Sequence, residues 1–262
     1  MNILVCIKQV PETNEVEVDE KTGVLQRDGI DSKMNPYDLY ALETALQLKE
    51  EIGGSITAIT MGPPQAQEII KEAYMMGVDD GYILSDRKFA GADTLATSYT
   101  LASGVKKIGD FDLIICGMQT TDGDTAQVGP AMGELLNLPH VAYVNQIVDA
   151  SETRLTVQKE MANTVEIVEC NYPALITVTK EVNQPRLPSF KLKLKTKDRE
   201  IKMLSLDDFE DQNQENYGLK GSPTQVERVF PPEANTEQTI WEESGEELAD
   251  LVYNKLKELK FV

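Results

Sequence analysis

The chain has 262 residues, 41% of them hydrophobic, and carries a formal net charge of −19. This length allows a sizeable buried core, whereas the charge argues against nucleic acid or an anionic membrane as the main partner. No apolar run is long enough to cross a bilayer, no secretion signal precedes the first predicted strand, and three separated cysteines disfavour a disulfide scaffold or structural zinc, so we expect a cytoplasmic protein.

Strand and helix signals alternate through the first two thirds of the chain. Continuous apolar runs predict buried strands over 2–10, 55–60, 80–85 and 112–117. Helical periodicity and end signals predict helices over about 36–51, 64–77 and 93–107, then a helix around 131–137 and a strand over 141–148. This order predicts an α/β fold: a mostly parallel, doubly wound sheet of the adenine-nucleotide-binding type, with helices on both faces.

The pattern changes after residue 150. Residues 154–170 predict a hairpin, and residues 173–180 predict a further central strand. Beyond Pro188, lysines alternate with apolar residues over 190–202, which is typical of an exposed edge strand. Two prolines predict an extended stretch over 230–233. The chain then ends in a predicted amphipathic helix, whose apolar stripe comprises Leu248, Leu251, Val252, Leu256 and Leu259.

These signals divide the chain into two predicted parts. Residues 1–187 form an α/β nucleotide-binding domain that includes the hairpin, and residues 188–262 form an extended C-terminal arm. The apolar stripe of the last helix has no obvious cover in its own chain, so we expect the arm to bind a partner subunit. Packing of this helix back on the sheet is the alternative.

Four segments are expected at the carboxyl ends of the parallel strands, where α/β sheets bind ligands. They are residues 6–9, residues 34–36 with Asn35 as a helix N-cap, residues 61–64, and the loop "CGMQTTDGDTAQVGP" over 116–130. The N-terminus of a helix presents free N–H groups and a partial positive charge. A phosphate group can therefore be held there although the loop has no lysine or arginine.

The loop over 116–130 has features of an anion-binding turn. Gly117, Gly123 and Gly129 are expected to permit positive φ angles or a close backbone approach. Asp122 and Asp124 do not suit a phosphate while ionised, so we expect them to accept loop N–H groups or to hold ribose hydroxyls. The spacing matches neither GxGxxG nor a P-loop, which excludes an ordinary assignment to either class.

An ordered set of motifs carries a family resemblance. "VCIKQV", "MNPYDLYALETAL", "ITMGPPQAQEIIKEAYMMGVDDGYIL", "DLIICGMQTTDGDTAQVGP" and "LPSFKLKLK" follow one another in the chain. Together they resemble the small (beta) subunit of electron-transfer flavoproteins over roughly residues 1–205. The resemblance implies a heterodimer with a larger alpha subunit, which carries the electron-transferring FAD.

The loop "TDGDTAQVGP" is similar to the branch of the family whose small subunit binds a second FAD. This similarity implies hydride transfer from NADH and electron bifurcation, with one electron passing through the alpha-subunit flavin to an acyl-CoA dehydrogenase-like partner and the other to ferredoxin or flavodoxin. An AMP-binding small subunit of a one-FAD flavoprotein is the alternative. A non-catalytic adenine-nucleotide sensor is a third hypothesis, although such sensors resemble shorter chains with the glycine loop near the C-terminus.

The resemblance also implies individual site residues. The family's adenine and ribose contacts fall on Cys6, Asn35 and Met61, and its partner-docking leucine falls on Leu187. Its phosphate-binding segment falls on Gly117, Asp122, Gly123, Asp124, Thr125, Gln127, Val128 and Gly129. Taken alone, Cys6 and Met61 are typical core residues, Asn35 a helix cap, the two aspartates turn residues and Leu187 a loop residue. No catalytic side chain or metal ligand is predicted.

Overall fold

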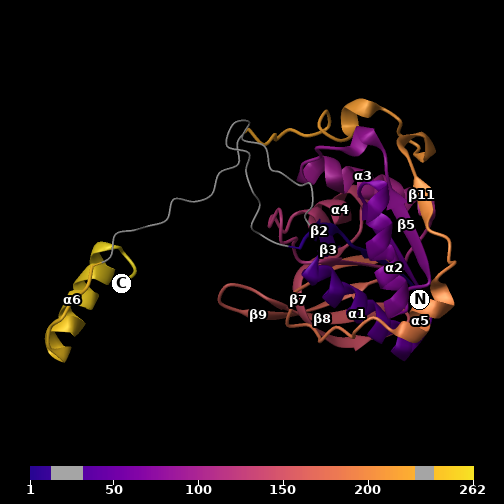
Figure 1. The fold of residues 1–262 in the computed structure, drawn as a ribbon. Coiled ribbons are helices and arrows are strands. Elements are labelled where there is room, and N and C mark those ends of the chain that lie inside the picture. The colour runs from indigo at the N-terminus through magenta and orange to yellow at the C-terminus, as the bar shows by residue number, and fades with distance from the viewer. Residues whose placement is uncertain (13–31, 228–238) are drawn as a thin grey trace. The chain divides into compact units, whose positions relative to one another are not determined.

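In the computed structural model, which describes residues 1–12, 32–227 and 239–262, the chain divides into the units Met1–Glu227 and Arg228–Val262. The first unit contains a nine-stranded sheet with the order β11-β5-β4-β1-β6-β10-β7-β8-β9 (Figure 1). Its strands are β1 (Asn2–Cys6), β4 (Ser55–Met61), β5 (Asp80–Leu84), β6 (Leu113–Gly117), β7 (His140–Ala150), β8 (Arg154–Glu160), β9 (Val165–Asn171), β10 (Ala174–Val178) and β11 (Lys202–Leu204). Pairing is parallel from β11 to β7 and antiparallel in β7-β8-β9.

Helices cover both faces of this sheet. The helices are α1 (Pro36–Ile52), α2 (Gln67–Met76), α3 (Thr94–Ile108), α4 (Val128–Leu136) and α5 (Phe190–Thr196), with short 3-10 turns at Pro64–Ala66, Arg87–Phe89, Leu206–Asp208 and Gln214–Asn216. Side chains alternate between the faces of a strand. Ile3 and Val5 of β1 therefore pack with α1 and α2, while Leu4 packs with α3 and α4. The predicted doubly wound α/β fold is confirmed.

The first apolar run does not form a single strand. The chain leaves the large sheet after Cys6, and β2 (Gln9–Pro11) pairs antiparallel with β3 (Ser32–Met34) in a separate two-stranded sheet. The prediction of one strand over 2–10 is therefore wrong. Ile7 and Val10 are nevertheless buried, so the run is apolar because it stays inside the protein and not because the strand continues.

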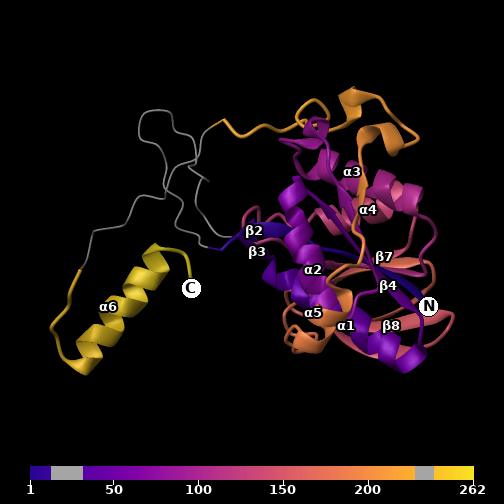
Figure 2. The same ribbon diagram turned by 45° about the vertical axis from the view of Figure 1, so that its right-hand side comes forward.

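The lysine-rich segment after Pro188 is a helix and not the predicted edge strand over 190–202. Ser189 caps α5 by accepting the N–H of Leu192, and the buried Thr196 donates to the Leu192 carbonyl one turn earlier. Figure 2 shows α5 beside α2. This tertiary contact overrides the period-two alternation of lysine and apolar residues. The sheet edge is formed instead by β11, which pairs with β5.

The first unit extends beyond the predicted boundary at residue 187 and ends at Glu227. Two of its later residues, Phe209 and Tyr217, are buried against Phe89, and each ring centroid lies 5.6 Å from that of Phe89. The second unit contains α6 (Gly245–Glu258), which agrees with the predicted C-terminal helix. The predicted extended stretch over 230–233 lies outside the described residues, and partner binding by the arm stays a prediction.

Membrane insertion has no support among the helices of residues 1–12, 32–227 and 239–262. None of them combines the length and the apolar character that a bilayer crossing requires.

The aromatic cluster gives a test of where the folded unit ends. Phe209→Ala should lower the free energy of unfolding by about 3 kcal/mol, because a buried ring is removed from a packed cluster. Urea denaturation measures this, with Val226→Ala as the control, since Val226 is 83% exposed. Equal midpoints for the two variants would mean that residues 188–227 contribute nothing to the core.

Candidate functional site

The order of strands reverses at β1. The chain runs from β1 to β4 and β5 on one side, and then returns to place β6 on the other side of β1. Cys6 and Cys116 are register partners at the carboxyl ends of β1 and β6. Ligands of open α/β sheets bind in the crevice at such a switch point. The segments that follow β1 and β6 are therefore the candidate site.

Asn35 joins this crevice to the start of α1. Asn35 occupies the N-cap position, as predicted, but its side chain makes no capping hydrogen bond. The amide Nδ2 donates to Asp38 Oδ1 at 2.9 Å and to the Gln119 carbonyl at 2.9 Å, while Oδ1 accepts the Thr121 N–H at 3.2 Å. Both amide hydrogens are thus used within the protein. A ribose or adenine contact through this side chain would fall to Oδ1.

Asp38 is a buried carboxylate at the base of the site. It accepts the Lys8 N–H at 2.7 Å, the Asn35 amide, and the backbone N–H of Gly117. Burial raises the pKa of Asp38 to about 7, against the opposing effect of these hydrogen bonds. Sequence reasoning missed this residue because an aspartate in the first turn of a helix is common at the protein surface.

The one lysine among residues 1–12 supplies the cation that the loop lacks. Lys8 Nζ lies 2.8 Å from Asp122 Oδ2 in an ion pair. Burial alone would raise the pKa of Asp122, but the hydrogen bond and the charge of Lys8 hold it below its usual value. The sequence predicted that Asp122 accepts loop N–H groups or holds ribose, and Lys8 was missed because it is far away in the sequence.

The three loop glycines differ in what the structure requires of them. A Cβ at Gly117 would overlap Asp38 Oδ1, and one at Gly129 would overlap the Thr177 methyl group. The predicted close approach therefore holds at both. A Cβ at Gly123 would meet only Thr120 Oγ1, at 3.5 Å, so the structure gives no reason for glycine at this position.

Positive φ angles occur at other loop positions than the predicted glycines. Asp124 has φ 53° and Ala126 has φ 55°, so the backbone on both sides of Thr125 is left-handed. L-residues adopt this region at a cost, and such turns can direct several N–H groups toward one point. The left-handed turns of the loop before α4 therefore lie at Asp124 and Ala126 and not at its glycines.

The N-terminus of α4 opens directly from this loop. The helix begins at Val128, earlier than predicted, and the side chain of its N-cap residue Gln127 makes no capping bond. Gly129 presents no side chain, and Pro130 has no N–H. An uncapped helix start with a bare glycine in its first turn suits a phosphate group. The residues present thus fit the phosphate part of a nucleotide.

Cys6 and Met61 lie at the same edge of the sheet, at the ends of β1 and β4. Cys6 is buried, and a hydrogen bond that its thiol donates to Cys116, together with burial, raises the pKa of this thiol well above the usual value. A neutral, buried thiol suits packing against an apolar ring and not nucleophilic chemistry. Met61 is half-buried and packs on the same core. Their contact with a nucleotide stays a prediction.

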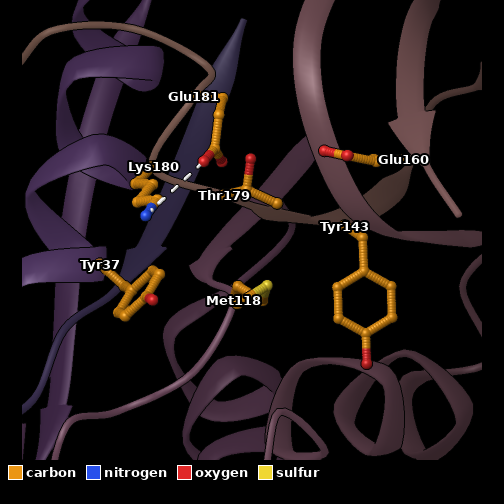
Figure 3. A pocket seen from close by; sticks show the side chains of 7 residues that line it. All are labelled: Tyr37, Met118, Tyr143, Glu160, Thr179, Lys180 and Glu181. Carbon is orange, nitrogen blue, oxygen red and sulfur yellow. Dashed lines mark ion pairs between the residues drawn. The ribbon is translucent and has the colours of Figure 1, made fainter. Parts of the chain in front are cut away.

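A cavity of about 370 Å³ adjoins the loop at the carboxyl ends of β6 and β10 (Figure 3). Tyr37 and Tyr143 lie on opposite sides of it, with Met118 and Thr179 between them. Its remaining lining residues are Glu160, Lys180 and Glu181. No motif in the sequence indicates this cavity.

Two features of the cavity wall are unusual. Tyr143 has φ 62° within β7, a conformation that a bulky residue rarely adopts. Thr179 Oγ1 is buried and lacks a hydrogen-bond partner among the described residues. Strained backbone and unsatisfied polar groups concentrate at functional sites. The cavity is therefore a candidate binding space beside the loop.

The predicted docking residue Leu187 lies outside the crevice. It belongs to the segment between β10 and α5, with Pro188 after it and Pro185 two residues before it, and is 88% exposed. In the parts of the chain that the structure describes, no group of three or more histidine, cysteine or acidic side chains is placed to hold a metal ion.

The sheet order, the uncapped α4 and the bare glycines define a doubly wound α/β protein with a candidate nucleotide-phosphate site at its switch point. Residues 22–209 match the family model described as "Electron transfer flavoprotein domain". The chain belongs to the electron transfer flavoprotein family, as the motifs indicated.

Relatives match along nearly the whole chain. The chain is 44% identical over 262 residues to "Electron transfer flavoprotein subunit beta" of Clostridium acetobutylicum, which covers 100% of both chains. It is 44% identical over 260 residues to "Caffeyl-CoA reductase-Etf complex subunit CarD" of Acetobacterium woodii, covering 98% of each. It is 41% identical over 244 residues to "Protein FixA" of Azorhizobium caulinodans, covering 91% of this chain and 87% of that protein.

The pKa of Asp38 predicts a pH dependence of stability. Its ordinary value is 3.8 and its folded value is about 7, so between these values the folded protein holds a proton that the unfolded chain releases. The contribution of Asp38 to stability therefore falls as pH rises from about 4 to about 7, by at most about 1.4 kcal/mol per pH unit.

Urea denaturation of the wild type and of Asp38→Asn across this pH range measures the effect. The free energy of unfolding of the wild type relative to that of Asp38→Asn should decrease steadily as pH rises. Parallel plots of unfolding free energy against pH for the wild type and Asp38→Asn would show that folding does not raise the pKa of Asp38.

Proposed function

We propose that this chain is the small subunit of a heterodimeric electron transfer flavoprotein and binds FAD in the crevice between β1 and β6. The observation that carries the proposal is the uncapped start of α4 beside Gly129, in a loop whose acidic residue Asp122 is already paired with Lys8. Pairing with Lys8 reduces the repulsion that Asp122 would exert on a phosphate. Backbone N–H groups at the start of α4 then hold the phosphate charge.

FAD is preferred to AMP in this subunit for two reasons. The loop "TDGDTAQVGP" is similar to the two-FAD branch, and the 370 Å³ cavity adjoins the loop through Met118. A ligand that ends at its phosphate needs only the start of α4, whereas a dinucleotide needs further space. The aromatic rings of Tyr37 and Tyr143 offer surfaces suited to a flat ring system.

The proposed activity is bifurcation of electrons from NADH. Bound FAD supplies the chemistry of accepting a hydride and releasing single electrons. The proposed acceptors are an acyl-CoA dehydrogenase-like flavoenzyme, reached through the FAD of the alpha subunit, and ferredoxin or flavodoxin. The name of the Acetobacterium woodii relative places that protein in a complex with a caffeyl-CoA reductase, which supports a partner that acts on acyl-CoA compounds.

In this proposal the protein's own residues bind and orient the nucleotide. Cys6 and Met61 provide an apolar wall for the adenine, and Asn35 Oδ1 is available to a ribose hydroxyl. Asp124 and Thr125 lie in the strained part of the loop, next to the start of α4. Their position suits contacts with the ribose or with the diphosphate.

The first test is a count of nucleotides in the purified heterodimer. The chain is copurified with its alpha subunit and the nucleotides released on denaturation are identified. We expect two FAD per heterodimer, with one FAD reduced directly by NADH. One FAD and one AMP without a response to NADH would contradict bifurcation and favour the one-FAD alternative. A colourless preparation would favour an adenine-nucleotide sensor.

The contact beneath Gly129 predicts a more specific result. Gly129→Ala places a methyl group against the Thr177 methyl, which should displace the start of α4 and lower the affinity for FAD about tenfold or more. Adding Thr177→Ser removes the opposing methyl and should restore much of the affinity. Thr177 Oγ1 accepts the Tyr143 N–H at 3.1 Å, and serine keeps this bond.

Gly123→Ala is the matched control, because its new methyl group has space. Affinity is measured by calorimetric titration of heterodimer stripped of the small-subunit nucleotide. If all three variants kept wild-type affinity, the nucleotide would not lie on the start of α4.

A further inference from the structure

A single arginine fixes the segment that presents Leu187. Arg186 Nε donates to Glu43 Oε2 at 2.8 Å, and Nη2 donates to Glu43 Oε1 at 3.0 Å. Nη1 donates to Glu50 Oε1 at 2.6 Å. The Arg186 backbone N–H also donates to Glu43 at 3.1 Å. Backbone and side chain are thus both bound to α1.

The geometry of this clamp is demanding. Glu43 and Glu50 are seven residues apart and therefore lie on one side of α1. One guanidinium group reaches both, because its N–H groups form a rigid planar fork. Burial alone would raise the pKa of the Glu43 carboxyl, but hydrogen bonds from Arg186 lower it. The bonds to Glu43 and Glu50 in turn raise the pKa of Arg186. Gln47 Nε2 also donates to Glu43 Oε1, at 3.1 Å, but the cation that pairs with this buried carboxylate is Arg186.

The chain is also fixed on both sides of the clamp. Before it, Asn183 Nδ2 donates to the Tyr40 carbonyl at 3.1 Å and to Thr44 Oγ1 at 2.8 Å. After it, the Ser189 N–H donates to the Met75 carbonyl at 2.8 Å. Two prolines restrict the backbone between these points. Leu187 is thus an exposed side chain on an immobilised stretch of backbone.

Two further apolar side chains shortly after Leu187 in the chain are also exposed. Phe190 is 72% exposed and Leu194 is 60% exposed, one turn apart on α5. Lysines flank this apolar pair, at Lys191, Lys193 and Lys195 within α5 and at its C-cap residue Lys197. On a chain with a net charge of −19, a local group of lysines beside exposed apolar side chains is suited to a partner with an apolar socket and an acidic rim.

From these contacts we infer that Arg186 is a positioning residue for partner docking. Its clamp on Glu43 and Glu50 holds Leu187 ready to enter the apolar socket of the acyl-CoA dehydrogenase-like partner. The inference rests on the proposed function, which supplies the class of partner. The clamp acts by pre-organisation: a segment that is already ordered loses less conformational entropy on binding. Arg186 itself need not touch the partner.

The test compares variants of the complete heterodimer with its alpha subunit. Arg186→Met combined with Glu43→Gln removes the clamp without stranding a buried charge. Arg186→Lys keeps the charge but not the fork. Binding is measured on an immobilised short-chain acyl-CoA dehydrogenase from the same organism, and electron transfer to that enzyme gives kcat and KM. We expect the double variant to raise Kd and KM about tenfold with kcat and flavin content unchanged, and Arg186→Lys to fall between.

A double-mutant cycle with Leu187→Ala separates positioning from general destabilisation. If the clamp acts through Leu187, removing the clamp from a protein that already carries Leu187→Ala should have no further effect on Kd. Additive effects of the two changes on Kd would overturn the inference. A raised Kd in Leu187→Ala together with an unchanged Kd after loss of the clamp would overturn it as well. Wild-type Kd in Leu187→Ala, or no binding by the wild type, would instead contradict the proposed docking itself. The count of FAD and AMP in the purified heterodimer tests the proposed nucleotide binding separately, and none of these docking results changes it.

Discussion

The carboxylate of Asp38 is the contact on which the rest of the candidate site depends. Three chain segments meet there, from the end of β1, the start of α1 and the end of β6, and each donates an N–H group to it. Open α/β sheets generate a crevice wherever the strand order reverses, but the sheet alone does not fix the loops around it. In this chain the bonds to Asp38, together with those of Asn35 to the loop, set the position of residues 117–122.

The charged groups of the candidate site lie at two separate places, one at each end of the loop before α4. The acidic side chain of Asp122 is neutralised by Lys8 at one end of the loop, and the uncapped α4 offers its N–H groups at the other. With the charges arranged in this way, the proposed phosphate site needs no lysine or arginine in the loop itself.

Much of this arrangement could be predicted from the sequence. Buried strands and helix ends are local signals, so the alternation of helices and strands between residues 36 and 180, the N-cap position of Asn35 and the loop between β6 and α4 follow from the sequence. Lys8 and Asp38 were not, because their roles depend on partners brought near by folding: Lys8 and Asp122 are 114 residues apart. The helix α5 was mistaken for a strand because a period-two pattern is local, whereas its contact with α2 is not.

Helix α1 carries Asp38 in its first turn, and Glu43 and Glu50 further along. Each additional residue in an α-helix turns everything beyond it by about 100°. One insertion or deletion between residues 38 and 43 would therefore point Asp38 and the two glutamates in incompatible directions. An insertion or deletion in this stretch is therefore incompatible with keeping both the contacts of Asp38 and those of Glu43 and Glu50. Relatives that retain both features should differ here by substitution alone, with the spacing of five and seven residues conserved.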